Sequence, residues 1–309
     1  MRNYKKGLEF SFAWIFAMIA GTGILFLAIF FAVKYTGTGS TYTDTLSAKR
    51  LSIIFEPFET GLASGKSGLV NLNEDTRIYN KCYSDNGFGK QKFSLATKQF
   101  KKWSKPSIEI SISDKYVFSN ESEEGKEAYF FSKPFNMPWK VSSLVFLTTE
   151  DYCFVDAPDF IKEEVSELGL KNIKVDNCSR EIKVCFNRDS CPIKVSGNCD
   201  RCTNEYEYGI VSKNGRNMFY TGSLIYAAIF SSPDIYECNV KRLMKRALEQ
   251  ALVFREEADY LQGKCGVSGN FIQLANMAKN INNSAELILI RDIAEELEVQ
   301  NEASECSFW

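Results

Sequence analysis

The chain begins with a long apolar segment: 24 consecutive residues, Phe10 to Val33, carry no charge. As a helix this segment is about 36 Å long, enough to cross a hydrocarbon core of about 30 Å. A cleaved secretory signal has an apolar region of only about 7–15 residues and ends in small residues, whereas this run ends in Phe30, Phe31 and Val33. The sequence therefore predicts a retained, single-pass transmembrane helix over residues 10–33.

Basic residues flank this segment unequally. Three precede it within residues 1–9, whereas Lys34 is the only one after it until Lys49. Because basic residues are enriched on the cytoplasmic side, we expect residues 1–9 in the cytoplasm and residues 34–309 outside the cell membrane.

Three small residues, Ala13, Ala17 and Gly21, recur every four positions in the predicted span. Such a stripe lets two transmembrane helices approach closely, so it is a candidate face for self-association. The alternative is composition alone, since Ala and Gly are frequent in membrane helices. The bilayer is thus the expected partner, with a second copy as a candidate and any other protein partner unknown.

The start of the chain also resembles a type IV pilin signal, on the residues Lys5-Lys6-Gly7 followed by an apolar helix. The resemblance implies cleavage after Gly7 and a helix that packs into a filament core. The sequence departs from the pattern at the fifth position after the cut, where pilins usually carry Glu and this chain has Phe12. Cleavage therefore stays open at this point.

The chain contains no histidine and ten cysteines. The first count excludes Ser-His-Asp triads and histidine-ligated metals, and no cofactor or metal site is predicted. The ten cysteines predict structural disulfides in an oxidising compartment, since all ten lie beyond the span. For Cys199-x-x-Cys202, the alternatives are a redox pair or half of a zinc ribbon. The candidates are Cys82, Cys153, Cys178, Cys185, Cys191, Cys199, Cys202, Cys238, Cys265 and Cys306.

Two pairings follow from the predicted helices. Cys265 and Cys306 follow the ends of the long and the final helix, so we expect them to pair. Cys238 lies at the start of the long helix, too far from either, and is expected to pair with Cys82 or Cys153.

The predicted fold is α+β, with a β-rich extracytoplasmic region followed by a helical part with one long helix. Residues 34–48 are rich in Gly, Ser and Thr and predict a flexible tether. Residues 49–232 contain short apolar or alternating runs, starting with Leu51–Phe55, and Asn214-Gly215 predicts a type I′ hairpin turn. Helical periodicity takes over in residues 233–309, with a long helix to about Leu261.

Motifs for chemistry are weak. Gly61–Ser67 resembles a phosphate-binding loop but is one residue too short. The segment 86–107 has six lysines and no acid, interleaved with aromatic residues; this is either a solvated face or a surface for anionic lipid headgroups or a polyanion. The net charge of −2 argues against nucleic acid. Without histidine, catalysis would need carboxylate pairs or a Ser/Lys dyad, and no G-x-S-x-G or Ser-x-x-Lys motif is present.

Five segments together resemble a group of uncharacterised single-pass membrane proteins from ultra-small archaea: ETGLASGKS (59–67), TRIYNKC (76–82), FSKPF (131–135), EDYCF (150–154) and IFSSPDIYECNVKRLMKR (229–246). The group has no assigned activity, so the resemblance implies a location and no site residues. We expect a membrane-anchored extracytoplasmic protein with a structural or interaction role and no evident catalytic activity. The alternatives are a pilin-like filament subunit and a cell-surface hydrolase that uses carboxylates.

Overall fold

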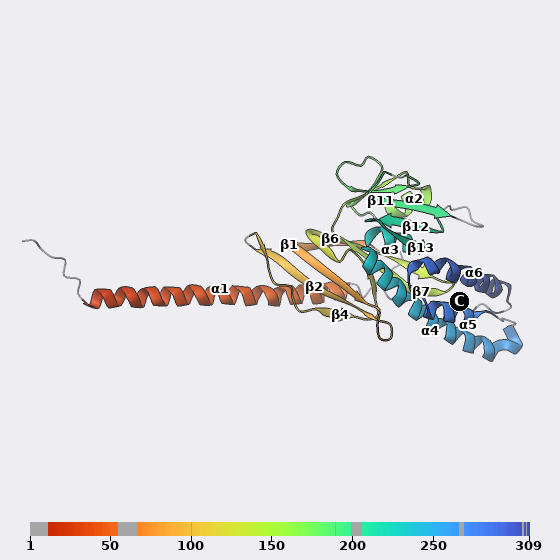
Figure 1. Cartoon of the computed structure of the whole chain (residues 1–309), viewed down its shortest axis with the longest axis horizontal. Helices are drawn as coiled ribbons and strands as arrows, with labels where there is room; N and C mark the ends of the chain where they lie inside the picture. Colours follow the sequence, from red (N-terminus) through yellow and green to blue (C-terminus); the bar gives the residue numbers. More distant parts are fainter. Residues whose placement is uncertain are drawn as a thin grey trace, which may run out of the picture.

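The computed structural model describes residues 12–54, 67–99, 101–188, 190–198, 206–265, 269–304, 306 and 308–309. It is α+β, as predicted: an N-terminal apolar helix, two mixed sheets, then C-terminal helices (Figure 1).

Helix α1 (Phe12–Ile54) projects from the rest of the molecule (Figure 1). Its part Phe12–Ala32 is long and apolar enough to cross a membrane, and none of that part is buried. The helix continues through residues 34–48, which are therefore not a flexible tether, and Leu51–Ile54 is helical instead of a strand. Extending a helix that has already formed costs little, and this second part also packs along β2 and β4 (bounds below).

The first sheet has the strand order β3-β2-β1-β6-β7-β5, with β4 also paired to β2. All neighbours are antiparallel except β5 and β7, which are parallel. Its strands are β1 (Ser67–Tyr83), β2 (Lys90–Gln99), β3 (Lys102–Trp103), β4 (Ile110–Ile112), β5 (Tyr116–Phe118), β6 (Ser122–Asn136) and β7 (Lys140–Thr148).

The second sheet has the order β13-β12-β11-β10-β8-β9. The predicted hairpin is confirmed: Asn214 and Gly215 join β12 to β13 with φ of 54° and 73°, the left-handed values that a type I′ turn requires. Its elements are β8 (Tyr152–Val155), helix α2 (Asp159–Glu167), β9 (Ile173–Val175), β10 (Ile182–Phe186), β11 (Ile193–Asn198), β12 (Tyr208–Lys213) and β13 (Arg216–Thr221).

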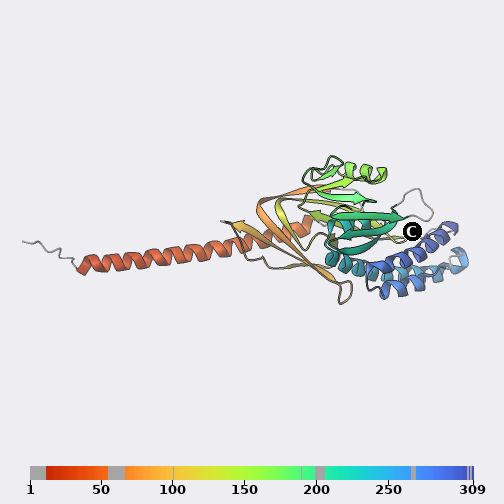
Figure 2. The same ribbon diagram turned by 45° about the horizontal axis from the view of Figure 1, so that its top comes forward.

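Of the remaining helices, α3 and α4 lie against both sheets, and α6 lies against β13 of the second sheet (Figure 2). The long helix is confirmed as α4 (Pro233–Cys265), and α5 packs along it. The main core gathers aromatic rings between α3 and the sheets; Phe131 and Phe146 stack at 4.5 Å and Phe230 meets Phe131 edge-on at 5.4 Å. The other helices are α3 (Leu224–Phe230), α5 (Phe271–Lys279), the 3₁₀ turn η2 (Ser284–Glu286) and α6 (Leu287–Ala303).

Three disulfides join described cysteines: Cys82–Cys238, Cys153–Cys178 and Cys185–Cys191. The first confirms one of the two partners predicted for Cys238. The other, Cys153, was wrong, because its strand β8 lies beside β9 and the loop after β9 brings Cys178 to it.

Four cysteines stay outside these three bonds. Cys199 and Cys202 lie outside the described residues. Cys306 is disulfide-bonded, and Cys265 is the last residue of α4. The predicted pairing of Cys265 with Cys306 stays a prediction.

Loop length predicts that the disulfides contribute unequally to stability. Cys82–Cys238 spans 156 positions and Cys185–Cys191 only 6. In the chain-entropy model the longer loop stabilises by about 3 kcal/mol more. We expect the double variant C82S/C238S to lower the free energy of unfolding by that much more than C185S/C191S, as measured by urea unfolding of detergent-solubilised protein. Equal losses would contradict this reading.

Candidate functional site

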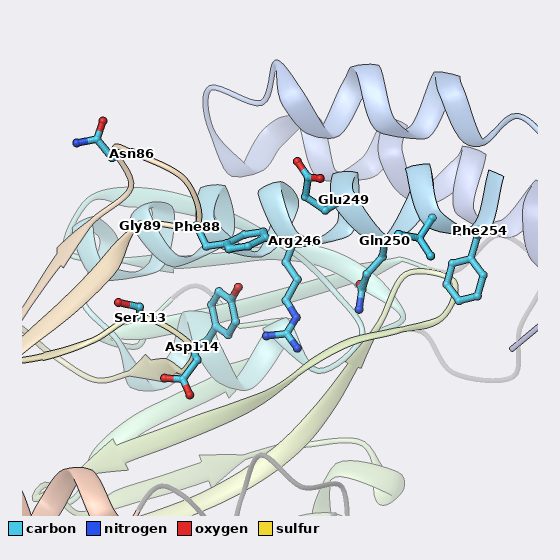
Figure 3. Close-up of a pocket in the computed structure, with 11 residues that line it drawn as sticks. Asn86, Phe88, Gly89, Ser113, Asp114, Arg246, Glu249, Gln250 and Phe254 are labelled. Carbon is cyan, nitrogen blue, oxygen red and sulfur yellow. The ribbon is translucent and has the colours of Figure 1, made fainter. Parts of the chain in front are cut away.

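An open groove lies where the middle of α4 passes two turns of the first sheet (Figure 3). Its volume is about 750 Å³. One wall is α4; the other is formed by the β1–β2 turn and by the β4–β5 turn with the start of β5. The lining residues are Asn86, Phe88, Gly89, Ser113, Asp114, Tyr116, Arg246, Glu249, Gln250, Val253 and Phe254.

Helical spacing explains why α4 presents one face to this groove. Its lining residues fall at positions 246, 249, 250, 253 and 254, which lie on one side of a helix with 3.6 residues per turn. Leu243, Ala247 and Ala251 lie on the adjoining side of the helix and are fully buried in the core. The helix is thus fixed by its apolar face, and the groove side is left for polar and aromatic groups.

Arg242, one turn before Arg246, ties the two walls together. Its side chain is fully buried, and its guanidinium donates to the carbonyl oxygens of Phe88 at 3.1 Å and Ser113 at 2.9 Å, one from each turn. It also donates to the carbonyl oxygen of Lys115 at 3.0 Å. Both turns are therefore bonded to the same residue of α4.

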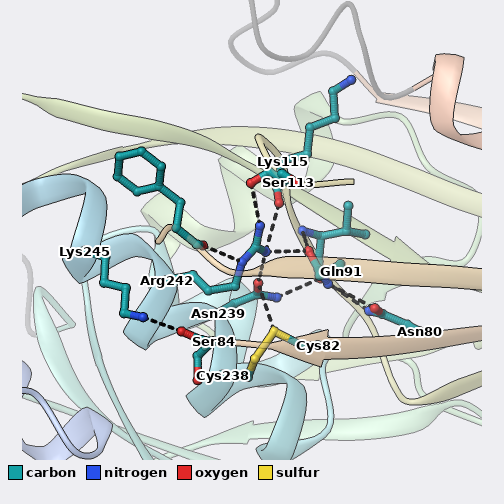
Figure 4. Close-up of a disulfide and its surroundings, with 12 residues drawn as sticks. Asn80, Cys82, Ser84, Gln91, Ser113, Lys115, Cys238, Asn239, Arg242 and Lys245 are labelled. Atoms are coloured by element: carbon teal, nitrogen blue, oxygen red, sulfur yellow. Dashed lines mark hydrogen bonds between the residues drawn. A yellow bond between two sulfur atoms is a disulfide. The ribbon is translucent and has the colours of Figure 1, made fainter. Parts of the chain in front are cut away.

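The guanidinium also meets buried side chains (Figure 4). It donates to Gln91 Oε1 at 3.1 Å and Asn239 Oδ1 at 2.8 Å, and it lies 4.8 Å from the centre of the Tyr116 ring. Burial lowers the pKa of Arg242 to about 10, so the group stays charged near neutral pH. Carbonyl dipoles and the face of an aromatic ring stabilise this charge. Among the described residues, no carboxylate forms a salt bridge with Arg242.

Two amides extend this network to β5. Gln91 and Asn239 both donate to the carbonyl oxygen of Val117, at 2.7 and 3.0 Å, and Gln91 accepts from the Val117 N–H at 2.8 Å. The disulfide Cys82–Cys238 joins β1 to α4 beside Asn239 (Figure 4). The base of the groove is thus fixed covalently and by hydrogen bonds.

Gly89 is required where the β1–β2 turn enters this site. Its φ is +67°, and a Cβ there would lie 2.3 Å from the carbonyl oxygen of Tyr83 and 3.0 Å from Cγ of Arg242. No other residue fits without moving the backbone.

The groove combines exposed apolar side chains with charged groups. Phe88, on the β1–β2 turn, is 47% exposed, and Val253, on α4, is 62% exposed. Arg246 extends from α4 into the groove (Figure 3) and forms no ion pair with the residues that the structure describes. Asp114 and Glu249 are exposed beside it. The arrangement suits a ligand with an apolar side chain, a carboxylate for Arg246 and N–H groups for the two acids.

A hydrolase would need carboxylates that are open to a substrate, and the carboxylate Glu123 is buried by the fold. Glu123 accepts four hydrogen bonds, from the backbone and side chains of Asn120 and Thr149, at 2.8 to 3.0 Å. Its side chain is 1% exposed, and burial raises its pKa. The carboxylate has hydrogen-bond donors for both oxygens and is closed off from solvent, so we assign it a structural role.

Lys213 lies nearby and is also buried. Its ammonium donates to Asn120 Oδ1 at 3.2 Å and to the carbonyl oxygens of Ile229 and Ser231 at 3.0 Å. Burial lowers its pKa to about 8. Because it donates to the Ser231 backbone and not to the hydroxyl, no Ser/Lys dyad is formed there.

The other sequence candidates lie away from the groove. Ala13, Ala17 and Gly21 are exposed on α1. The loop-like residues 61–66 lie outside the described residues, and Ser67 begins β1. Within the described ranges no three His, Cys, Asp or Glu side chains gather as metal ligands.

No family model matches the chain, and neither a curated protein nor a solved structure matches it.

Two arginines one helical turn apart give a matched test of the groove. Arg242→Met removes five hydrogen bonds, three of them buried, so we expect a loss of more than about 3 kcal/mol in the free energy of unfolding. Arg246→Met removes no described bond and should change it by less than about 0.5 kcal/mol. Urea unfolding measures both, and equal effects would refute the assigned roles.

Lys213 predicts a pH dependence. Between pH 8 and 10.5 the unfolded chain binds more protons at this lysine than the folded chain, so its contribution to the free energy of unfolding rises with pH. From pH 7 to pH 10 the wild type should gain about 2 kcal/mol relative to Lys213→Met. Lys171→Met, at an exposed lysine, is measured alongside as the control. A difference between wild type and Lys213→Met that does not change with pH would show that the ammonium is not desolvated.

Proposed function

We propose that the chain is a membrane-anchored extracytoplasmic protein with an interaction role, which binds a peptide-like ligand in the groove between α4 and the first sheet. The observation that carries this proposal is Arg246, which forms no ion pair with any described residue and lies beside exposed Phe88 and Val253. A charged group left without a partner next to open apolar surface is typical of a binding site.

The proposed location is supported by three independent features. The apolar part of α1 is long enough to span a bilayer. The basic residues before it favour a cytoplasmic N-terminus. Three disulfides, all beyond the span, fit an oxidising compartment.

The ligand class is tested with N-acetyltryptophan and its amide, which share a shape and differ in the carboxylate. With the full chain in lipid nanodiscs, saturation-transfer NMR should give about tenfold tighter binding of the acid, the magnitude of a hydrogen-bonded charge pair. In Arg246→Gln the two probes should bind alike. Equal binding of both probes by the wild type, or binding of neither, would refute the proposed ligand class.

Arg255→Gln is the matched control. Arg255 lies nine residues further along α4, half a turn round the helix, and its partner is Asp259 at 3.7 Å. This variant should keep the preference for the acid.

A pilin-like filament subunit is the second candidate. The observation that favours it is the unbroken α1, whose first part is exposed and whose second part packs on the sheet. Intact-mass measurement distinguishes the two: a mature chain that begins at Leu8 supports the filament subunit, and a chain that keeps residues 1–7 supports the uncleaved anchor.

A further inference from the structure

The strands β2 and β3 form a tight hairpin that carries the basic residues of the segment 86–107. Lys101 sits in the turn with a left-handed φ of 65°, and Lys98 pairs with Trp103 across the strands. Behind the turn, Ser104 N–H donates to the Thr97 carbonyl oxygen at 2.8 Å, and Thr97 N–H donates to the Ser104 hydroxyl at 3.0 Å. The hairpin is therefore a defined part of the sheet.

Its tip is cationic and aromatic. Trp103 is half-buried, with the guanidinium of Arg77 at 4.3 Å and the ammonium of Lys98 at 5.5 Å from its ring centre. Lys101, Lys102 and Lys105 are exposed and form no ion pair with described residues.

Acidic residues lie near this tip, but they do not neutralise its positive charge. Glu124 forms an ion pair with Arg77 at 2.6 Å, and Glu74 and Asp75 are exposed in the neighbouring irregular part of β1. Against these three acids stand five basic groups, which leaves an excess of positive charge at the tip: Arg77, Lys98, Lys101, Lys102 and Lys105.

The hairpin points back along α1. In Figures 1 and 2, β2 runs from the β1–β2 turn towards the apolar part of α1, opposite in direction to the helix. The helix continues beyond Ala32 to Ile54, about 33 Å, and packs along β2 and β4. The ten residues of β2 extend over a similar length, about 33 Å, so the tip lies at the end of the sheet nearest the predicted bilayer.

We propose that the β2–β3 tip contacts anionic lipid headgroups on the membrane surface from which the second part of α1 emerges. Lysines near an anionic surface are attracted to it, and tryptophan favours the interface between headgroups and hydrocarbon. The inference rests on α1 as the anchor and is independent of the ligand in the groove. With the helix in the bilayer and the tip on its surface, the outer part is held at two points.

The test uses the full chain in nanodiscs of phosphatidylcholine, with or without phosphatidylglycerol. Acetylation of lysines by a neutral reagent is followed by mass spectrometry. At low salt, phosphatidylglycerol should slow the reaction of Lys98, Lys101, Lys102 and Lys105 at least about threefold, and high salt should remove the effect. Lys279 is the control and should react equally in both discs; it is exposed on α5, a helix that lies on the side of the molecule away from the apolar part of α1 (Figure 1).

Charge reversal provides the matched variants. K101E/K102E should abolish the protection of Lys98 and Lys105, whereas K171E/K279E, at two exposed lysines elsewhere, should keep it. Equal acetylation in both discs would overturn the proposal. So would protection by soluble polyphosphate alone, which would make the tip a polyanion site. If the chain did not enter nanodiscs at all, the anchor would be refuted, and this inference with it.

Discussion

The buried charge of Arg242 is the constraint on which the middle of the molecule depends. Removing a guanidinium from water is costly unless its N–H groups find acceptors. Here the acceptors are carbonyl oxygens of two separate turns and two amide side chains, so the charge is stable only when α4, β2 and the start of β5 are all in place. The same requirement shapes the groove above it, because the turns that accept from Arg242 also form one of its walls.

A second buried pair lies where the two sheets meet. Glu123 on β6 and Lys213 at the end of β12 are linked through Asn120, which donates to the carboxylate and accepts from the ammonium. Desolvation shifts the two pKa values towards each other, up for the acid and down for the amine. The cost is offset by full hydrogen bonding, and the arrangement fixes the hairpin of the second sheet against the first.

Local signals made part of this fold predictable. The hairpin at Asn214-Gly215 was predicted from a turn dipeptide, and helix α4 from a 3.6-residue apolar period. Both signals come from residues that are close together in the sequence. The long strand β1 is not among the runs expected from the sequence, because its middle, Asn73 to Asp75, is polar and exposed and its order comes from distant partners such as Glu124, which pairs with Arg77 from 47 positions away. The tether prediction failed for a similar reason: packing on β2 and β4 is not visible in residues 34–48.

The site was less predictable than the fold. Arg242 and Arg246 each follow a lysine in one stretch, KRLMKRALEQ (241–250). Nothing in the neighbouring residues indicates that Arg242 is buried and that Arg246 is open to the groove. The β1–β2 and β4–β5 turns determine which arginine is buried, because their carbonyl oxygens accept hydrogen bonds from Arg242. The six lysines of the segment 86–107 were visible at once, but their direction relative to the membrane depends on how β2 lies along α1.

The unbroken course of α1 has a mechanical consequence. A flexible linker would let the outer part rotate freely, whereas a continuous helix transmits torque from the bilayer to the sheet. Successive residues are offset by about 100° round a helix. If the residue of the apolar segment that makes a contact in the membrane changes by one position, the second part of α1 and the sheet packed on it turn by about that angle. In the proposed anchored protein, the direction in which the groove faces around the membrane normal would be set by the face of the apolar segment that is in contact, and two copies packed through that segment would present their grooves in one fixed relative orientation.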